Sequence, residues 1–428
     1  MIGLVLIGVF ALMLILNVPV GIALGIASLV TVLSNPSIGA SDTYIVQNLV
    51  TAIDSFPLMA VPFFVLAGEL MSGGGISKRL LNTFNCFFGR ITGGLAIVAV
   101  VACMFFAAIS GSGPATVAAI GGMVLPTMLE KGYERKFILG LLAAAGCIGV
   151  IIPPSIPMVI YGVSTNASIT DLFLAGFIPG IVIGLALIAV AYSISKKHGW
   201  RDTELHLTGR EKLRTIWEAK WALIAPVIVL GGIYGGIFTP TEAAAVSCVY
   251  SFIVGVFVYR ETSIREIGAI IKSSCLTTGT ILIVTGSAAA FSKVLSIGQI
   301  PQQIAALMIG FTGSKIVLLI LINIMLLIVG CFMETLCSIM ILAPLFLPIV
   351  EAFGIDPIHF GIIMVVNLAI GFITPPLGIN LFVAVRLGNS TLEDVVKGIL
   401  PFLIAMIIVL LLITYIPQIS LFLPNLFD

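Results

Sequence analysis

The chain has 428 residues, of which 60% are hydrophobic and only 9% are charged, and its mean hydropathy is +1.23. A net charge of +1 leaves no basic surface of useful size, which excludes a nucleic-acid partner. Apolar runs near the roughly 20 residues that cross a bilayer recur along the whole chain. The composition therefore predicts an all-α polytopic membrane protein with little chain left for a soluble domain.

Residues 1–90 are predicted to form N-terminal scaffold and arm segments. Their first apolar run, 1–16, is interpreted as a transmembrane segment and not as a signal peptide, because no basic residue precedes it and no small-residue cleavage pattern follows. No lysine or arginine occurs before Lys78 or in the C-terminal tail, 417–428. By the positive-inside rule, both termini are predicted to be periplasmic.

A first repeat core is predicted over residues 91–195, beginning with a helical hairpin. The apolar run 94–109 ends at Ser110-Gly-Ser-Gly-Pro-Ala-Thr116 and resumes as far as Pro126, which leaves too few residues on either side for two comfortable spans. This pattern predicts a re-entrant hairpin over 91–129 that turns inside the membrane.

The same core continues with an apolar stretch, 137–165, that is interrupted by Gly149-Val-Ile-Ile-Pro153-Pro154. Proline removes a backbone donor and glycine weakens the same turn, so several carbonyls and amides lose their helical partners. Non-helical backbone at membrane depth is tolerated only where it is buried in protein or lines a polar cavity. The interruption therefore predicts a broken helix at a binding site.

The middle of the chain separates the two cores. Residues 196–216 form the largest polar stretch and are predicted to be a cytoplasmic loop, because their cluster of charges is basic on balance. The cluster contains Lys196, Lys197, Arg201, Arg210, Lys212 and Arg214, against Asp202, Glu204 and Glu211. Residues 217–310 are predicted to supply scaffold helices and a connection, with apolar runs at 219–237 and 241–259.

A second repeat core is predicted over residues 311–416. Gly330-Cys-Phe-Met-Glu-Thr335 separates two apolar runs and predicts a second re-entrant hairpin over 315–350. Gly371-Phe-Ile-Thr-Pro375-Pro376 follows and predicts a second broken helix over 358–388. Paired interrupted segments of this kind point to the binding site of a secondary transporter.

The two cores are related by one constant shift in residue number. The loop 130–136 is basic on balance whereas the loop 351–356 carries only acids, so the two loops are predicted to face opposite sides of the membrane. We therefore predict an inverted-topology repeat in which both hairpin tips and both broken helices meet near the midplane. The shift aligns residues that fix backbone shape, among them Pro126 with Pro348, Gly132 with Gly354, Gly149 with Gly371, Gly176 with Gly398 and Pro179 with Pro401.

The interruptions also predict a ligand chemistry. Helix N-termini present unpaired N–H groups that suit an anion, and unwound carbonyls present oxygens that suit a small cation such as Na⁺. Neither break contains a titratable side chain, which favours sodium coupling over proton coupling. The candidate oxygens belong to Ser110, Ser112, Gly149, Ile152 and Pro154 around the first break, and to Gly330, Thr335, Gly371, Thr374 and Leu377 around the second.

Several motifs along the chain occur together. They are Asp54-Ser-Phe-Pro-Leu-Met-Ala-Val-Pro-Phe-Phe-Val-Leu-Ala-Gly-Glu69, Gly75-Ile-Ser-Lys-Arg79, Ser110-Gly-Ser-Gly-Pro-Ala-Thr116, Pro153-Pro-Ser-Ile-Pro157, Gly235-Gly-Ile-Phe-Thr-Pro-Thr-Glu-Ala-Ala244, Met333-Glu-Thr335 and Thr374-Pro-Pro-Leu-Gly-Ile-Asn380. With them, nearly the whole chain resembles the large membrane subunit of tripartite ATP-independent periplasmic (TRAP) transporters, the DctM-like proteins. The resemblance implies a Na⁺-driven elevator importer of organic acids in a bacterial inner membrane, with scaffold and transport domains and two or more coupling ions.

The resemblance further implies two partners, a small four-helix membrane subunit (DctQ-like) and a periplasmic substrate-binding protein (DctP-like) that delivers a carboxylate solute. C4-dicarboxylate, sialic acid and other sugar acids all fit as solutes. The implied sodium ligands are Ser110, Ser112, Gly149, Ile152, Pro154, Gly330, Gly371, Thr374 and Leu377. The implied substrate-binding residues are Ser110, Ser112, Thr116, Glu334, Thr335 and Asn380.

Other polar residues are expected to have structural roles. Glu69 and Glu242 are interpreted as helix caps or snorkelling side chains, and Arg386 is interpreted as a contact to lipid headgroups. Glu334 lies at the second hairpin tip, where a functional and a structural role are equally compatible with the sequence. Four asparagines are expected to form hydrogen bonds between helices, namely Asn17, Asn323, Asn367 and Asn380.

Three other functions compete with this interpretation. Gly111-Ser112-Gly113 superficially suggests an intramembrane serine protease, but no histidine is expected inside a span and His359 only begins one, so an enzyme is not predicted. A channel would need a continuous pore, usually built by an oligomer, whereas inverted repeats with hairpins favour alternating access. The nearest rival is a stand-alone ion-coupled carrier of organic anions that works without a binding protein.

Overall fold

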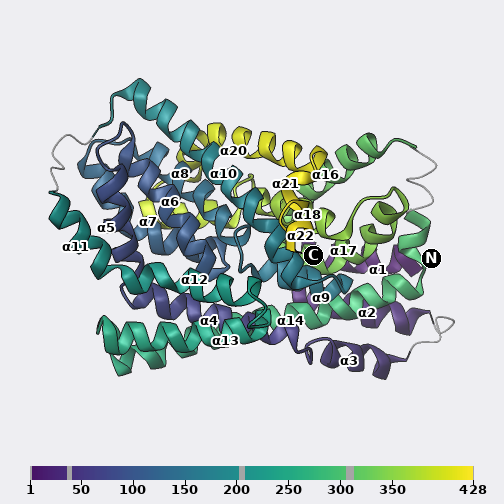
Figure 1. The fold of residues 1–428 in the computed structure, drawn as a ribbon. Helices are drawn as coiled ribbons and strands as arrows, with labels where there is room; N and C mark the ends of the chain where they lie inside the picture. The colour runs from purple at the N-terminus through teal and green to yellow at the C-terminus, as the bar shows by residue number, and fades with distance from the viewer. Residues whose placement is uncertain (1, 36–40, 202–207, 305–312, 428) are drawn as a thin grey trace.

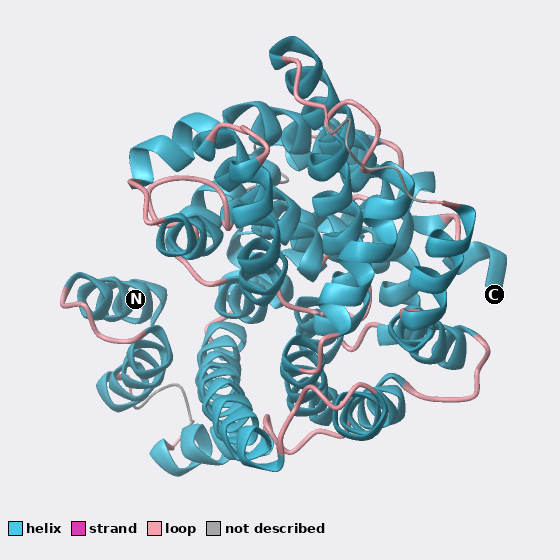
Figure 2. Ribbon diagram, turned by 90° about the vertical axis from the view of Figure 1, so that its left-hand side faces the viewer, coloured by secondary structure: helices cyan, strands magenta, loops and turns pink. Residues whose placement is uncertain are grey.

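The computed structural model describes residues 2–35, 41–201, 208–304 and 313–427, and within these residues all regular secondary structure is helical. Figure 1 shows helices of very different length packed into one bundle, and Figure 2 shows the same elements joined by short loops. The structure therefore confirms the prediction of an all-α protein.

The N-terminal part contains three helices and a bent pair. The helices are α1 (Ile2–Ile15), α2 (Val20–Ser34) and α3 (Asp42–Thr51), and the pair is η2–α4 (Pro57–Met59 and Ala60–Gly73) with α5 (Ile76–Phe88). The axes of the pair differ by 65°. The bend falls at Gly74 and Gly75, and Gly75 has a φ of 72°, a left-handed conformation that glycine adopts at no steric cost. With 14 residues, α1 is shorter than a straight span needs, and its crossing of the membrane stays a prediction.

The predicted first hairpin and first broken helix are both present as helix pairs. The hairpin is α6 (Gly94–Ser110) with α7 (Gly113–Glu130), and the broken helix is α8 (Arg135–Cys147), a 3₁₀ turn η3 (Ile148–Val150) and α9 (Ile156–Thr165). The long helix α10 (Ile169–His198) completes this half.

The middle of the chain is more helical than predicted, because helices enter the predicted loop 196–216 from both sides. The helix α10 continues through His198, and α11 (Gly209–Glu218) begins well before residue 216. After α11 come α12 (Lys220–Tyr234), α13 (Pro240–Ile253) with a π-helical turn η4 (Val254–Val258), and the 34-residue α14 (Ile264–Ile297).

The second half repeats the order of the first. It contains α16 (Lys315–Phe332), α17 (Thr335–Ala352), α18 (Pro357–Gly371), α19 (Ile379–Gly388), α20 (Leu392–Tyr415), and the short α21 (Gln418–Leu421) and α22 (Pro424–Phe427). The shift that aligns Gly149 with Gly371 also carries the start of α7 onto the start of α17, and the start of α8 onto that of α18. Helix boundaries thus follow the shift found in the sequence. The opposite orientation of the two halves in a membrane stays a prediction.

The two halves interlock. The helix α20 packs on α8, α17 packs on α9, and α19 packs on both α7 and α8. Small residues allow this close approach, since a Cβ built on Gly140 would lie 2.5 Å from the Gly398 carbonyl oxygen. The Tyr161 hydroxyl also donates to the Pro357 carbonyl at 2.7 Å, and Arg135 donates to the Gly388 carbonyl at 3.2 Å.

Within the described residues, six helices are long and apolar enough to cross a membrane, or up to eight if each bent pair counts as one span. They are Ile169–His198, Pro240–Val258, Ile264–Ile297, Lys315–Phe332, Thr335–Ala352 and Leu392–Tyr415. Three of these helices, 240–258, 315–332 and 335–352, coincide with apolar runs read from the sequence, and the six agree with the predicted multi-pass membrane protein.

Three of the four predicted structural asparagines bridge helices. Asn367 donates to the Asn323 side-chain oxygen at 2.8 Å, Asn323 donates to the Thr414 hydroxyl at 3.2 Å, and Asn380 donates to the Ala143 carbonyl at 3.1 Å. The prediction is wrong for Asn17, which has a left-handed φ of 60° in the turn after α1.

His359 lies at the start of a helix, as predicted, but its side chain is not exposed. It is the third residue of α18, yet its side chain is buried because α20 and α21 cover it. Its ring nitrogens lie 2.7 Å from the Ser420 hydroxyl and 3.4 Å from the Thr414 carbonyl oxygen. The buried imidazole therefore extends the polar network that links α16, α18 and α20.

We expect Asn367→Ala to destabilise the protein by about 1 kcal/mol, because it removes the two hydrogen bonds that Asn367 donates to Asn323. The measurement is thermal unfolding in detergent, with the exposed Asn425→Ala as a control. Equal unfolding temperatures for the two variants would contradict this role of the network.

Candidate functional site

Both hairpin tips and both broken helices meet at one cavity of about 400 Å³. Its lining residues are Gly111, Ser112, Gly113, Pro114, Val150, Ile156, Pro157, Thr277, Thr280, Ile281, Glu334, Thr335, Leu336, Phe372 and Ile379. The size is that of a small-molecule site. Segments from both halves of the chain thus supply one concave surface, as the sequence predicts.

Local sequence explains the sharp turn at the first hairpin tip. Gly111 ends α6 with a φ of 60°, and the extended Ser112 precedes α7, whose second residue is Pro114. Proline is favoured there because the first turn of a helix has amides without intrahelical partners. The tip is tied by hydroxyls, since Thr116 donates to the Ser112 carbonyl at 2.7 Å and lies 3.2 Å from the Ser110 hydroxyl.

The first broken helix packs directly against this tip. A Cβ built on Gly149 would lie 2.5 Å from the Thr116 hydroxyl and 2.6 Å from the Ser112 carbonyl oxygen, so only glycine fits. A Cβ on Gly111 would lie 2.9 Å from the Pro154 carbonyl oxygen. The structure therefore gathers the backbones of the predicted sodium set around Ser110, Ser112, Gly149 and Pro154. Ile152 lies in the same turn, and its amide donates to the Ile148 carbonyl at 3.0 Å.

The second tip and the second broken helix make the corresponding contact. A Cβ on Gly371 would lie 2.5 Å from the Gly330 carbonyl oxygen and 2.7 Å from the Gly330 Cα atom. One turn later, the Thr374 hydroxyl donates to the Ile370 carbonyl at 2.8 Å, which leaves its oxygen lone pairs free to accept a cation. Leu377 lies in the break itself, with 48% of its surface exposed.

The two breaks differ in exposure. Every residue from 151 to 160 is buried, whereas Pro375, Pro376 and Leu377 are exposed. The unwound backbone of the first break is covered by protein, and that of the second is open on one side. The two predicted cation sites are therefore not equivalent in their access to solvent.

Four helices begin at the cavity wall. They are α7 at Gly113, α9 at Ile156, α17 at Thr335 and α19 at Ile379. Of these four, only α9 has a side-chain cap, where the Ser155 hydroxyl accepts from the Met158 amide at 3.4 Å. The first-turn amides of the other three helices have no such cap. Together with the helix dipoles they offer hydrogen-bond donors that suit an anion.

The carboxylate of Glu334 lies in the same wall. It precedes α17, its contact with the Cys337 thiol is weak at 3.7 Å, and its backbone carbonyl accepts from the Ser338 hydroxyl at 3.0 Å. Its location in the cavity favours a functional role for Glu334 over a purely structural one. A carboxylate here can attract a cation, and it can repel the anionic group of a solute from its own part of the cavity.

Of the predicted substrate-binding residues, the structure brings only Ser112, Glu334 and Thr335 to the cavity wall. Ser110 and Thr116 are buried behind the first tip, where their hydroxyls bond within the hairpin. Asn380 is fully buried and points its amide at α8. Direct contacts with a solute stay a prediction for all six residues.

Sequence reasoning missed the contribution of α14. Thr277, Thr280 and Ile281 from the middle of this long helix close the cavity opposite the tips. A signal was available in the hydroxyl-rich run Ser273-Ser-Cys-Leu-Thr-Thr-Gly-Thr280 within an otherwise apolar helix. Such hydroxyls are as easily interpreted as helix-packing groups, so the sequence alone does not place these residues at the cavity.

Two glutamates at motif positions have the structural roles expected for them. Glu242 completes a capping box at the start of α13, where its carboxylate accepts from the Thr239 amide at 2.8 Å and the Thr239 hydroxyl accepts from the Glu242 amide. Glu69 accepts from the Ser273 hydroxyl at 3.0 Å and so joins α4 to α14. Arg386 is exposed on α19, and its contact with lipid headgroups stays a prediction.

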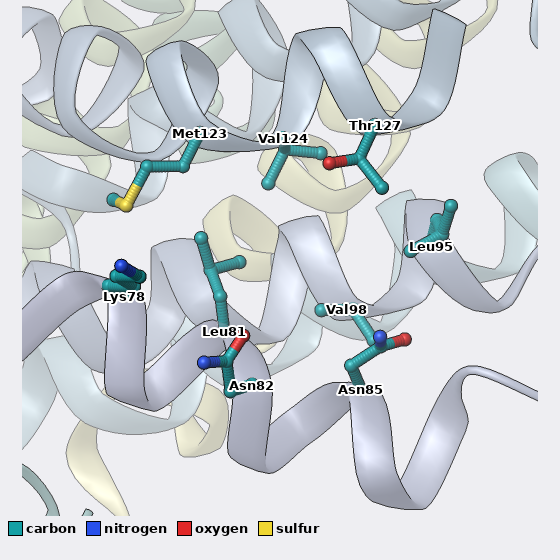
Figure 3. A pocket seen from close by; sticks show the side chains of 9 residues that line it. All are labelled: Lys78, Leu81, Asn82, Asn85, Leu95, Val98, Met123, Val124 and Thr127. Carbon is teal, nitrogen blue, oxygen red and sulfur yellow. The ribbon is translucent and has the colours of Figure 1, made fainter. Parts of the chain in front are cut away.

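A second polar pocket of about 450 Å³ lies between α5, α6 and α7 (Figure 3). Its polar groups are the Lys78 ammonium, the Asn82 and Asn85 amides and the Thr127 hydroxyl. None of its lining residues belongs to the predicted site. Its walls come from the first half of the chain alone, whereas both halves contribute to the cavity between the tips.

The sequence matches the family described as "Tripartite ATP-independent periplasmic transporter, DctM component" over residues 7–419. An isethionate TRAP transporter permease protein DctMQ of Oleidesulfovibrio alaskensis is 50% identical, over 98% of this chain and 66% of that protein's length. A C4-dicarboxylate TRAP transporter large permease protein DctM of Pseudomonas aeruginosa is 45% identical, with 87% of each chain covered. A sialic acid TRAP transporter large permease protein SiaM of Vibrio cholerae is 39% identical, with 96% of each covered.

Among solved structures, the YdaH transporter of Alcanivorax borkumensis is similar with a TM-score of 0.64. The alignment covers 87% of this chain and 88% of that one, at 16% sequence identity. At this identity the likeness concerns the fold alone. It shows that the order and packing of the helices recur in a solved structure.

We expect Gly371→Ala to disrupt the contact between the second tip and the second break, because the new methyl group would meet the Gly330 backbone, which cannot move aside. The cost should be about 1–3 kcal/mol. Thermal unfolding of the purified protein measures it.

The matched control is Gly122→Ala on α7, where a Cβ would meet only one Leu387 methyl group at 4.0 Å. If Gly371→Ala unfolds at the same temperature as this control, the close backbone contact does not exist in the protein.

Proposed function

The chain belongs to the DctM component family of tripartite ATP-independent periplasmic transporters, and on this premise we propose that it imports an organic acid across a bacterial inner membrane by Na⁺-coupled secondary active transport. In this proposal it is the transport subunit of a three-part complex. It is not an enzyme, because the family moves its solute and does not convert it.

The observation that carries the proposal is the convergence of four helix N-termini on one cavity, at Gly113, Ile156, Thr335 and Ile379. The uncapped first-turn amides of α7, α17 and α19 can bind the acid group of the solute without a basic side chain. Half-helix N-termini of this kind point at the anionic groups of solutes in transporters built from broken helices.

The solute is an organic acid, and its identity is set elsewhere in the complex. The names of similar proteins mention isethionate, C4-dicarboxylate and sialic acid, all of which carry an acid group. The cavity of about 400 Å³ is large enough for solutes of this range. Ser112, Thr335 and Glu334 are the side chains through which the cavity would orient the remainder of the solute.

Sodium coupling is supported by the oxygen-rich surroundings of both breaks. Hydroxyl and carbonyl oxygens are the ligands that a small hard cation takes, and each break packs against a tip through a pair of close backbones. At the first break the proposed ligands are Ser110, Ser112, Gly149, Ile152 and Pro154. At the second they are Gly330, Gly371, Thr374 and Leu377. A bound cation would neutralise oxygens next to the anion and so couple the two ligands.

An elevator movement is the proposed form of alternating access. The tips and breaks pack on one another, and α14 closes the cavity. The cavity therefore lies between a proposed transport domain, which contains the tips and breaks, and a proposed scaffold, which contains α14. The Gly74 and Gly75 bend between α4 and α5 can act as a hinge. The proposed partners are the small four-helix membrane subunit and the periplasmic binding protein, and both termini are proposed to be periplasmic.

We expect uptake by the reconstituted complex to require Na⁺, and Thr374→Val to raise the half-saturating Na⁺ concentration on the order of tenfold. The variant loses one oxygen ligand, worth about 1.5 kcal/mol. Uptake of a labelled solute is measured against Na⁺ concentration. Thr374→Ser keeps the hydroxyl and should behave like the wild type.

Undiminished uptake in Na⁺-free medium under a proton gradient alone would reject sodium coupling. A Thr374→Val variant with wild-type Na⁺ dependence would leave coupling intact but remove Thr374 from the site.

We further expect the chain, reconstituted with its small membrane subunit, to take up solute poorly until the periplasmic binding protein is added. The binding protein captures the solute and delivers it to the cavity. The measurement is uptake in proteoliposomes with and without that protein. Robust uptake of free solute in its absence would favour the stand-alone carrier.

A further inference from the structure

The helix α11 has a well-defined start in a region that the sequence assigns to a cytoplasmic loop. Thr208 and Glu211 form a capping box, in which the Thr208 amide donates to the Glu211 carboxylate at 2.7 Å and the Glu211 amide donates to the Thr208 hydroxyl. The bonds from the Thr208 amide and hydroxyl lower the pKa of Glu211. The helix that follows is therefore stably capped, yet none of its residues is buried.

The angle between α11 and α12 is also fixed. The two helices differ in direction by 51°, and two tyrosines bond the backbone groups near the bend. Tyr259 donates to the Glu218 carbonyl at 3.1 Å and accepts from the Ala222 amide at 3.2 Å, while Tyr250 donates to the Trp221 carbonyl at 2.6 Å. The helix α11 is thus turned away from the direction of α12 and held beside α5 (Figure 1).

One side of α11 is apolar and faces solvent. With 3.6 residues per turn, Leu213, Ile216 and Trp217 share one side of the helix. Leu213 is 69% exposed and Trp217 is 67% exposed, and the neighbouring Trp221 is 37% exposed. Ile216 is half-buried, since α11 lies against α5, whereas Leu213 and Trp217 stay exposed.

Positive charges border the apolar side on both edges. By the same geometry, Lys212 falls on one edge and Arg210 and Arg214 fall on the other, while the acids Glu211 and Glu218 fall on the opposite side of the helix. The acids are already engaged, because Glu211 caps the helix and Glu218 pairs with Arg214 at 2.8 Å. Among the described residues, no carboxylate lies within ion-pair distance of Arg210 or Lys212.

The lysine at the bend completes the pattern. The Lys220 ammonium lies 3.6 Å from the centre of the Trp217 ring and 5.4 Å from that of Trp221. Tryptophan and lysine are enriched at membrane–water boundaries, where the ring enters the headgroup layer and the cation reaches outward. A cationic edge on both sides of an apolar stripe is typical of helices that lie in the surface of anionic membranes.

We propose that α11, with Lys220, is a membrane-surface anchor that binds anionic lipid headgroups on the side where the loop 196–216 lies. Leu213 and Trp217 enter the acyl boundary, and Arg210 and Lys212 contact lipid phosphates. Lipid is favoured over a protein partner because α11 leads directly into the apolar α12. If α12 enters the bilayer, the end of α11 lies at the bilayer surface. The anchor would hold the connection between α10 and α12 in place while the cavity moves.

The experiment uses the full chain with its membrane partner, reconstituted in phosphatidylcholine vesicles with or without phosphatidylglycerol. Lipids brominated on the acyl chain quench tryptophan that enters the bilayer. The contribution of Trp217 is the difference between each protein and its Trp217→Phe version. The test variant is R210Q/K212Q, and the control is R265Q/K272Q, which removes the same charge from exposed positions on α14.

We expect stronger quenching of Trp217 when phosphatidylglycerol is present, and a loss of this gain at high salt. In R210Q/K212Q the ratio of membrane-bound to free α11 should fall about fivefold for each charge removed. The control variant should keep the wild-type quenching. Since both changes are on the surface, an unchanged elution profile verifies the fold.

Two results would overturn the proposal. Equal quenching of Trp217 in both lipids and in R210Q/K212Q would show that the helix has no preference for anionic headgroups. Absence of quenching in every vesicle would show that protein, and not lipid, covers the apolar side of α11.

Discussion

The constraint on which this structure depends is that backbone amides and carbonyls cannot be left without partners in hydrocarbon. Four helices end and four begin inside the bundle, so their free groups must be buried or must line a polar cavity. The chain uses both solutions. Carbonyls at the breaks pack against hairpin tips through Gly149 and Gly371, and the amides at the starts of α7, α9, α17 and α19 are collected around one cavity. In the proposed function, this main chain supplies the groups that bind both the anion and the cation.

Much of this arrangement can be predicted from the sequence, because glycine and proline act locally. A glycine followed within about one turn by a proline pair interrupts a helix whatever surrounds it, and the recurrence of this motif at Gly371 predicts the second break from the first. The first hairpin tip can be predicted from the sequence for the same reason, since Gly111 and Pro114 mark the end of one helix and the start of the next. Family membership follows from the same motifs and is confirmed by the match over residues 7–419.

What depends on tertiary packing could not be predicted. The hydroxyls of Thr277 and Thr280 face the cavity because α14 crosses in front of the tips, and no local pattern specifies that crossing. Asn380 follows a break, as a substrate ligand would, yet its amide is taken by the Ala143 carbonyl of α8. The burial of His359 likewise results from contacts with distant parts of the chain. The helix α11 in the predicted loop, by contrast, begins at a local capping box.

The most direct test of this account is a cryo-electron microscopy map of the complex with Na⁺ and a saturating transported acid. The account predicts that the acid group lies within hydrogen-bond distance of amides at the starts of α7 and α17, with a cation next to each break. An acid bound instead in the pocket of Lys78 and Asn82, between α5, α6 and α7, would contradict it.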